Sequence, residues 1–225
     1  MTDVFIFDAV RSPRGKGKPG APMADAALPH QLVAQLIAEL DRRHDVNPHI
    51  EQLTVSCVGQ TGAQGGHIGL VSKLEAGLAA ETVVHSVNNY CVGGLSAIGA
   101  AANAISAGVV DLAYAGGVEM MSHVPFGADR ASYFTDPAVA GALSYAPPGI
   151  GADLLAHLNG IDRATLDRWA LRSHHRAAAA WDAGIYDGSV VAITGADGDV
   201  ALARDETIVA DMTAEKIADS SMEPD

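Results

Sequence analysis

Hydrophobic and polar positions follow two different periods along the first 120 residues. Short apolar runs predict four strands, at Val4–Val10, Leu53–Gly59, Thr82–Val87 and Asp111–Ala115. Between the first two runs, apolar residues three and four apart predict a helix that begins near Pro29. A second helix, rich in small residues, is predicted from about Val92 to Ala107 and ends at Gly108. This alternation indicates an α/β fold in three layers with a mostly parallel sheet.

One stretch of the chain carries no charge. Between Glu81 and Asp111 there is no Asp, Glu, Lys or Arg. A helix that is apolar or small on every side is typical of a protein interior, so the second helix is expected to be buried all round. His85, three Asn and repeated Gly interrupt the stretch, which argues against a membrane span.

The second half of the chain differs in composition and in periodicity. From Ser122 to Gly151, Pro, Gly, Tyr and Phe recur without a period, which predicts a loop-rich excursion. Asp162 is then predicted to be the N-cap of a long helix that runs to Gly184. The predicted apolar face of this helix consists of Leu166, Trp169, Ala170, Ser173, Ala177 and Trp181. A short β-type run at Val190–Thr194 precedes a turn at Gly195–Asp199. This change in composition and periodicity predicts two domains, residues 1–121 and 122–225.

Composition and charge narrow the classes of function. The chain is 48% hydrophobic and 18% charged, so its 225 residues can bury a core. A net charge of −13 argues against nucleic acid as a partner. Basic residues nevertheless cluster in two places, where a local positive potential can arise, but solvated surface is the favoured interpretation for most of them. These residues are Arg11, Arg14, Lys16 and Lys18 in an early loop, and Arg163, Arg168, Arg172 and Arg176 further on.

Common motifs of nucleotide, hydrolase and metal sites are interrupted or absent. Residues 15–20 fit the G-x-G-x-x-G pattern of dinucleotide sites, but Pro19 and Pro22 interrupt the chain before a helix begins, which favours a flexible basic loop. There is no G-x-x-x-x-G-K-S/T phosphate loop and no G-x-S-x-G nucleophile elbow. The nine histidines show no H-E-x-x-H and no paired Cys/His spacing, so no metal site is predicted.

The two cysteines have different settings. No disulfide framework and no N-terminal signal are visible, so a reducing cytoplasm is the expected compartment. Cys57 lies within an apolar strand and is predicted to be a buried structural thiol. Cys91 follows a strand through the turn Asn88–Tyr90 and stands where the uncharged helix begins, a place that favours a thiolate. Gly93 and Gly94 leave room beside its sulfur. On these features alone, another buried cysteine is the simpler interpretation, because no His lies within sequence reach to act as a base.

Four ordered segments resemble the thiolase family. Residues 87–97, Val-Asn-Asn-Tyr-Cys-Val-Gly-Gly-Leu-Ser-Ala, resemble its nucleophile motif, an N-x-x-C turn that enters a helix containing glycine. Residues 111–125 resemble its A-G-G-x-E-x-M-S-x-x-P signature. The opening Asp8–Lys16 is similar to its first strand and loop, and Leu171–Ala180 is similar to the long helix of its loop domain. The resemblance covers essentially the whole chain.

The resemblance implies a fold and a reaction. Thiolases have two similar α/β halves, and the N-terminal half carries an inserted loop domain that binds coenzyme A. Residues 1–121 would be the thiolase N-terminal domain without its last strand, residues 122–225 the loop domain, and the C-terminal half is absent. Cys91 would be the catalytic nucleophile, acylated by an acyl-CoA, and the acyl group would then pass to CoA or to a second acyl-CoA. Its own backbone N–H would be one oxyanion donor. The coenzyme A thioester is a substrate, so no separate cofactor is expected.

The resemblance further implies an acyltransferase of fatty acid metabolism that forms homo-oligomers and has neither nucleic acid nor membrane as a partner. The chain departs from the family at Val92, where a small residue is usual, at Pro148–Ala152, where many members have M-G-x-x-A, and at Ala218–Met222, which lacks the usual basic residue. Residues that contact CoA are therefore not identified.

The family's later motifs N-E-A-H-P, G-H-P and C-x-G-G-G, which supply oxyanion groups, a base and a second cysteine, do not occur. A C-terminal thiolase half, in the same polypeptide or in a second chain, is thus the expected partner. Two alternatives stay open. One is another condensing enzyme of the superfamily, such as a decarboxylating ketoacyl synthase, and the other is a non-catalytic CoA-binding or assembly subunit.

Overall fold

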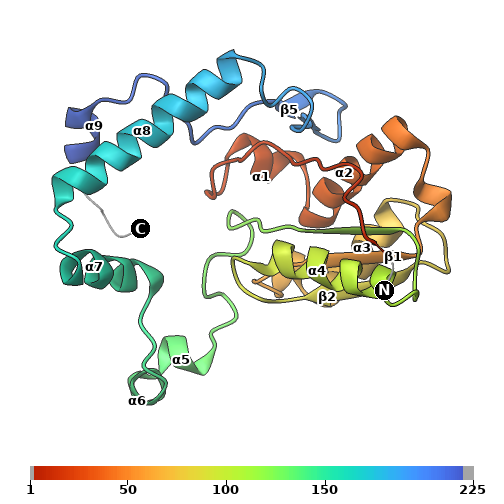
Figure 1. The fold of residues 1–225 in the computed structure, drawn as a ribbon, viewed down its shortest axis with the longest axis horizontal. Helices are drawn as coiled ribbons and strands as arrows, with labels where there is room; N and C mark the ends of the chain where they lie inside the picture. The colour runs from red at the N-terminus through yellow and green to blue at the C-terminus, as the bar shows by residue number, and fades with distance from the viewer. Residues whose placement is uncertain (1–2, 220–225) are drawn as a thin grey trace. The chain divides into compact units, whose positions relative to one another are not determined.

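Two units make up the chain in the computed structural model, which describes residues 3–219. Of the described residues, 3–129 form the first unit together with Ser189–Asp205, and Arg130–Gly188 forms the second together with 206–219. Figure 1 follows the chain through both units, from red at its beginning to blue at its end.

This division differs from the predicted boundary between residues 121 and 122. The segment Ser189–Asp205 belongs to the first unit because Arg11 holds it: the Arg11 N–H donates to the Ser189 carbonyl (2.8 Å), and the Arg11 carbonyl accepts from the Val191 N–H (2.9 Å). The Arg11 guanidinium also forms an ion pair with Asp205 at 2.8 Å. None of these long-range contacts leaves a periodic signal in the sequence.

A parallel sheet of three strands lies at the centre of the first unit. The strands are β1 (Gln52–Ser56), β2 (Val83–Val87) and β3 (Ala113–Gly117), in the order β2-β1-β3. Leu53 of β1 is in register with Val84 of β2 and with Tyr114 of β3, and both pairings are parallel. The predicted parallel α/β sheet is confirmed, with the third strand two residues later than expected.

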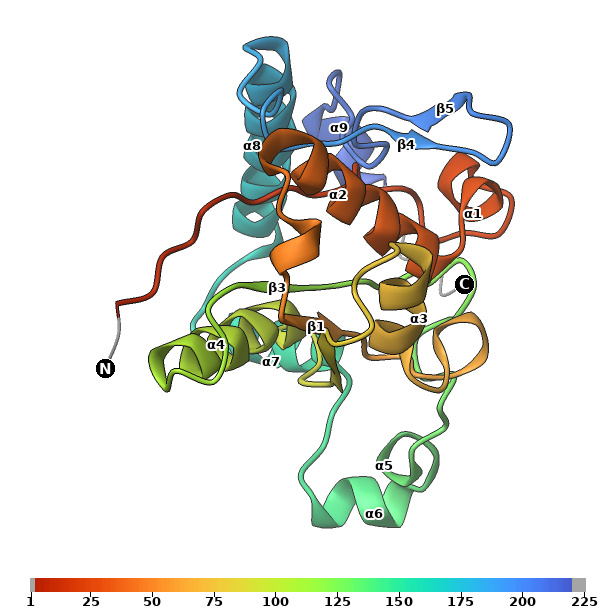
Figure 2. The same ribbon diagram turned by 90° about the vertical axis from the view of Figure 1, so that its right-hand side faces the viewer.

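Helices cover both faces of this sheet. On one face α2 (Pro29–His44) and α3 (Ile68–Glu75) pack with Leu53, Val55 and Cys57 in an apolar core. On the other face lies α4 (Gly93–Ser106), which packs on β1 and β3 (Figure 2). Because side chains alternate along a strand, the small residues Thr54 and Ser56 turn toward α4. The predicted three layers are therefore present.

The expectation that α4 is buried on every side is wrong within the described residues. Gly93, Ala97 and Ala101 face the sheet and are buried, whereas Leu95 is 71% exposed and Ile98 39%. A single sheet can cover only one stripe of a helix, so an apolar residue on the opposite stripe stays in solvent unless another layer packs on it.

The predicted strand Val4–Val10 is also wrong. Residues 3–10 pair with no strand in the described part of the chain, and Phe5, Ile6 and Phe7 are each at least 75% exposed. An apolar run becomes a strand only where a neighbour accepts and donates its backbone hydrogen bonds, and the recorded bridge begins only at Arg11, opposite Val190.

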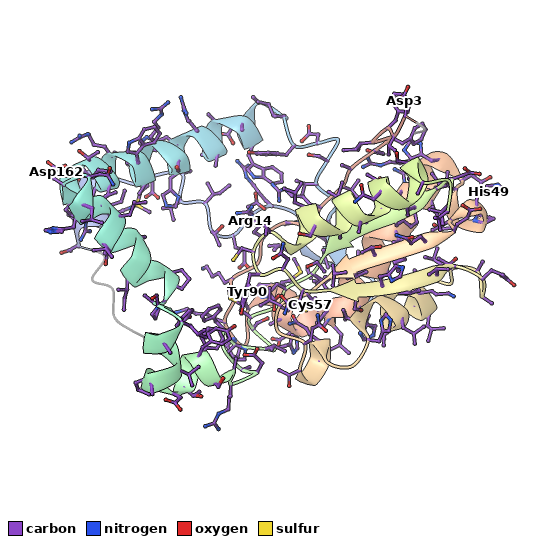
Figure 3. The ribbon with its side chains drawn as sticks, turned by 60° about the horizontal axis from the view of Figure 1, so that its bottom comes forward. Asp3, Arg14, His49, Cys57, Tyr90 and Asp162 are labelled. Carbon is purple, nitrogen blue, oxygen red and sulfur yellow. The ribbon has the colours of Figure 1, made fainter. Side chains whose placement is uncertain are left out.

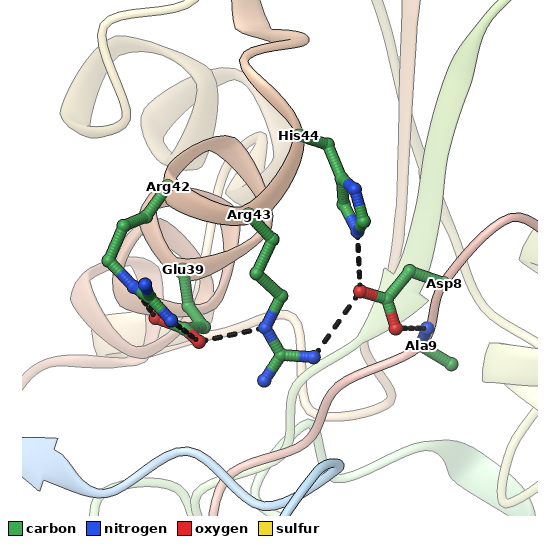
Figure 4. Close-up of polar contacts among 6 residues, drawn as sticks. All are labelled: Asp8, Ala9, Glu39, Arg42, Arg43 and His44. Carbon is green, nitrogen blue, oxygen red and sulfur yellow. Dashed lines mark hydrogen bonds and ion pairs between the residues drawn. The ribbon is translucent and has the colours of Figure 1, made fainter.

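Charged side chains hold this segment instead (Figure 4). His44 Nε2 lies 2.7 Å from Asp8 Oδ2, and Arg43 donates to the same oxygen at 3.3 Å. The hydrogen bond from His44 is the main reason that the pKa of Asp8 falls below its usual value. Glu39 accepts from Arg42 and Arg43, which lowers its pKa from 4.5 to about 2. The last turn of α2 thus anchors the N-terminal segment.

Short helices and a hairpin complete the described part of the first unit. The helices are α1 (Pro22–Ala26), η1 (Asn47–His49) and η2 (Gly62–Gln64). In the hairpin, β4 (Ile193–Thr194) runs antiparallel to β5 (Val200–Leu202) by way of the predicted turn at Gly195–Asp199. Gln35 of α2 binds the hairpin, since its amide donates to the Thr194 carbonyl and accepts from the Thr194 N–H, each at 3.0 Å.

The second unit is helical in its described residues. It contains α5 (Ser132–Thr135), α6 (Pro137–Ala142), α7 (Pro148–Leu158), α8 (Arg163–Asp182) and α9 (Ala214–Ala218). Three of these helices lie wholly or partly in the stretch predicted to be loop-rich. Pro137 and Pro148 each occupy the first turn of a helix, where proline starts a helix rather than breaking it.

The long helix α8 is confirmed, and Asp162 caps it by accepting from the Thr165 N–H at 2.8 Å. Its predicted apolar face is not buried: Leu166 and Trp169 are exposed, and Ala178 is the buried residue of this helix. Among residues 3–219, no helix has the length and apolar character that crossing a bilayer requires.

Candidate active site

Three loops of the first unit meet at the carboxyl ends of the parallel strands. They follow Ser56 of β1, Val87 of β2 and Gly117 of β3, which are partners in the register of the sheet. In Figure 3, Cys57 and Tyr90 lie together at this end, and His49 lies at the other. The carboxyl edge of a parallel sheet is the usual place for a ligand site in α/β proteins.

Cys91 stands in the loop after β2, in a turn with a constrained backbone. Tyr90 has a φ of 48°, in the left-handed region that a side chain other than glycine seldom adopts. Asn88 supports it, since its Oδ1 accepts the Tyr90 N–H at 3.0 Å. The Gly93 N–H then donates to the Tyr90 carbonyl at 2.9 Å and closes the turn around Cys91. Strained backbone of this kind persists where surrounding bonds determine it, as in many active sites.

The beginning of α4 lies very close to β1. A Cβ atom added to Gly93 would be 1.8 Å from Ser56 Oγ and 3.0 Å from Ser56 Cβ, so any side chain at this position would force Ser56 or the helix to shift. This close approach sets the first turn of α4 directly on the strand, with Val92 as N-cap and Cys91 one residue before it. The positive end of the helix dipole is therefore at the cysteine.

Cys57 is buried, as predicted, whereas the simpler interpretation of Cys91 as another buried cysteine is wrong. Cys57 is 1% exposed, and burial, reinforced by the nearby Glu119 carboxylate, raises the pKa of its thiol to about 12. Cys91 is exposed. A thiol that is both buried and protonated is inert, so Cys91 is the accessible thiol of this pair.

Sequence reasoning missed a polar network beside this turn. It placed Cys57 in an apolar strand, yet Cys57 Sγ lies 3.9 Å from Glu119 Oε2. Glu119 binds the loop after β1 through the N–H groups of Val58 and Gly59 and through the buried Gln64. The only sequence signal was the position of Glu119 within the A-G-G-x-E-x-M-S segment.

Several other residues singled out in the sequence have partners elsewhere in their own unit. In the early basic loop, Arg11 pairs with Asp205. On α8, Arg163 pairs with Asp167 and Arg172 stacks over Trp169. His174 and His175 bond backbone groups of Val209 and Met212. No three His, Cys, Asp or Glu residues within the described ranges gather as metal ligands.

Two hollows of about 350 and 200 Å³ lie in the first unit, and Cys91 lines neither of them. Val92, where the sequence departs from the family pattern, is 54% exposed next to Cys91. Of the stretch Ala218–Met222, residues 220–222 lie outside the described part.

Comparison with known proteins agrees with these features. The sequence profile described as "Thiolase, N-terminal domain" matches residues 4–222. The 3-ketoacyl-CoA thiolase of Marinomonas sp. is 36% identical over 228 residues, which cover 96% of this chain and 56% of that protein. The 3-ketoacyl-CoA thiolase of Erwinia tasmaniensis is also 36% identical, over 96% of this chain and 57% of that protein.

The crystal structure of the Bacillus anthracis acetyl-CoA acetyltransferase superposes with a TM-score of 0.78 at 27% identity, covering 93% of this chain and 56% of that one. The chain thus spans about half the length of the relatives it matches. A profile match over almost the whole chain, a parallel sheet and an exposed cysteine at the start of α4 lead to one assignment: this chain belongs to the thiolase family and carries its N-terminal domain.

Proposed function

We propose that this chain supplies the nucleophile for thiolase-type acyl transfer, and that the nucleophile is Cys91. The observation that carries the proposal is the setting of Cys91: an exposed thiol at the carboxyl edge of the sheet, in a turn closed by Tyr90 and Gly93, at the positive end of α4. The alternatives of a ketoacyl synthase or a non-catalytic subunit gain no support from relatives named as thiolases and an acetyltransferase.

In the first step, the Cys91 thiolate attacks the carbonyl carbon of an acyl-CoA thioester. The bond from that carbon to the CoA sulfur breaks, and the CoA thiolate leaves and takes up a proton. The S-acyl group on Cys91 then passes to CoA or to the enolate of a second acyl-CoA. The backbone N–H of Cys91 is proposed as one donor to the oxyanion that forms during attack.

Completion of the cycle is proposed to need a C-terminal thiolase half, in the same polypeptide or in a second chain. A base must lie within about 3 Å of the proton that it removes, and such a group typically contributes ~10²–10⁴-fold to the rate. The structure records no hydrogen bond from a base to the Cys91 thiol among residues 3–219. The proposal extends to a cytoplasmic homo-oligomer in fatty acid metabolism, with coenzyme A thioesters as substrates and no other cofactor.

Reconstitution tests this proposal. The purified 225-residue chain, mixed with CoA and acetoacetyl-CoA, is expected to consume acetoacetyl-CoA at a negligible rate. Addition of a separately produced C-terminal thiolase half is expected to start turnover, and the variant Cys91→Ala should abolish it while Cys57→Ala retains it. Turnover by the lone chain, or turnover that survives Cys91→Ala, would show that another residue carries the chemistry.

A further inference from the structure

Glu119 belongs to the loop after β3, yet its carboxylate holds the loop after β1. Oε2 accepts the Val58 N–H at 2.8 Å, and Oε1 accepts the Gly59 N–H at 3.2 Å and Gln64 Nε2 at 2.7 Å. Gln64 is fully buried, and its Oε1 accepts the Met120 N–H at 2.6 Å. The side chains of Glu119 and Gln64 therefore join two neighbouring loops into one unit.

Val58 connects these two loops to the loop that carries Cys91. Its carbonyl accepts Asn88 Nδ2 at 3.2 Å, and Asn88 Oδ1 accepts the Tyr90 N–H at 3.0 Å. Tyr90, in its left-handed conformation, directly precedes Cys91. A continuous series of hydrogen bonds thus runs from the loop after β3, across the loop after β1, to the residue before the nucleophile.

We propose that Glu119 is a positioning residue for the Cys91 turn, and that it acts through Val58 and Asn88. The proposal rests on the proposed function and deepens it, because it names the residue that fixes the direction of the nucleophile. A carboxylate suits this place since three N–H groups converge on it, and an ionised carboxylate offers acceptors only. A glutamine would direct its NH₂ group at one of these donors.

This network is expected to fix the conformation of the Cys91 turn rather than to add to the folding stability of the chain. Glu119 is itself exposed, and hydrogen bonds in contact with water add little to stability. The strain at Tyr90, by contrast, needs neighbouring bonds to maintain it. Removal of the carboxylate should therefore leave the fold intact and loosen the turn.

Hydrogen exchange of individual backbone amides in the purified chain tests the proposal. Glu119→Ala should speed exchange of the Tyr90 N–H roughly five- to tenfold, as expected for the loss of about one hydrogen bond. Glu119→Gln, which keeps one oxygen for Val58, should restore part of the protection. The matched control is Glu51→Ala, because Glu51 also accepts a backbone N–H from the neighbouring segment, that of Asp111, but at the opposite end of the strands. It should leave Tyr90 unchanged.

A double variant tests the route. If Glu119 acts through Asn88, exchange at Tyr90 in Glu119→Ala/Asn88→Ala should be no faster than in Asn88→Ala alone. Should Glu119→Ala not fold, Asn88→Ala with and without Glu119→Gln decides the same question. Additive effects, or a change confined to residues 58–64 and 118–124, would overturn the proposal.

A kinetic readout separates this proposal from the proposed function. Glu119→Ala should lower the rate constant for acylation of Cys91 at saturating acetyl-CoA, roughly tenfold for a modest misplacement of the reacting group, and leave the half-saturating concentration unchanged. If the unmodified chain is not acylated at all, the proposed function fails, and hydrogen exchange at Tyr90 still decides whether Glu119 positions the turn. Unchanged acylation in Glu119→Ala would count against positioning.

Discussion

Replacement of Gly93 by alanine should destabilise the first unit and displace the start of α4. The new Cβ would be 1.8 Å from Ser56 Oγ and 3.0 Å from Ser56 Cβ. Rotation of the Ser56 side chain could move the oxygen, but the Cβ stays in place, and Ser56 is buried. Extra atoms in a well-packed site typically cost ~1–3 kcal/mol. Alanine recovers at most ~1 kcal/mol through its helix propensity, so a net loss of about 1–2 kcal/mol is expected.

Thermal unfolding followed by circular dichroism measures this loss. In a chain of this size each kcal/mol lowers Tm by roughly 2–4 °C, so Gly93→Ala should unfold about 2–8 °C below the unmodified chain. Gly99→Ala is the matched control, because Gly99 lies in the same helix, is exposed and has no atom within 4 Å of the place that an added Cβ would take. It should gain up to ~1 kcal/mol from propensity alone.

A second substitution tests the cause. Ser56→Ala in the Gly93→Ala background removes the oxygen and leaves the 3.0 Å contact, so it should restore part of the lost stability. If Gly93→Ala raises Tm as Gly99→Ala does, α4 does not approach β1 as closely as described, and the account of how the Cys91 turn is held against the sheet fails.

Three further outcomes are expected. Iodoacetamide at neutral pH should label Cys91 in preference to Cys57, because the pKa of Cys57 is raised to about 12. Peptide mapping measures the labelling of each cysteine, and preferential labelling of Cys57 would contradict the prediction. Because the pKa values of Asp8 and Glu39 are lowered in the folded chain, these carboxylates should stabilise it above about pH 4.5, and this stability should be lost as the pH falls toward 2. The urea midpoint should therefore be lower at about pH 3 than at neutral pH. Glu39→Gln should lessen this difference. Brief proteolysis should cut first between Gly127 and Pro148, and cleavage confined to α4 would contradict this.

The sequence was sufficient for those parts of the fold that depend on local pattern. The period of α2, the cap at Asp162 and the runs that became β1 and β2 all have residues whose preference agrees with their final structure. Prediction failed where a neighbour decides the outcome. Val4–Val10 has a strand's composition but no partner within the described chain, and α4 has an interior composition with only one layer packed against it.

The candidate site was predicted in part. The position of Cys91 before a helix of small residues could be read from Asn88 to Gly94, and the family resemblance gave it a role. The polar network could not be read in this way. In the sequence, Glu119 is more than 50 residues from both Val58 and Gln64, and all of them lie outside the strands and long helices. Only the folded sheet brings them to one edge.

Transfer of an acetyl group from acetyl-CoA to Cys91 tests the central claim most directly. The purified chain is incubated with acetyl-CoA and digested, and mass spectrometry then locates the thioester-linked acetyl group. The account predicts acetylation of the peptide that contains Cys91, in the unmodified chain and in Cys57→Ala, and its absence in Cys91→Ser. Acetylation of Cys57, or no thioester in a chain whose Cys91 still reacts with iodoacetamide, would contradict it.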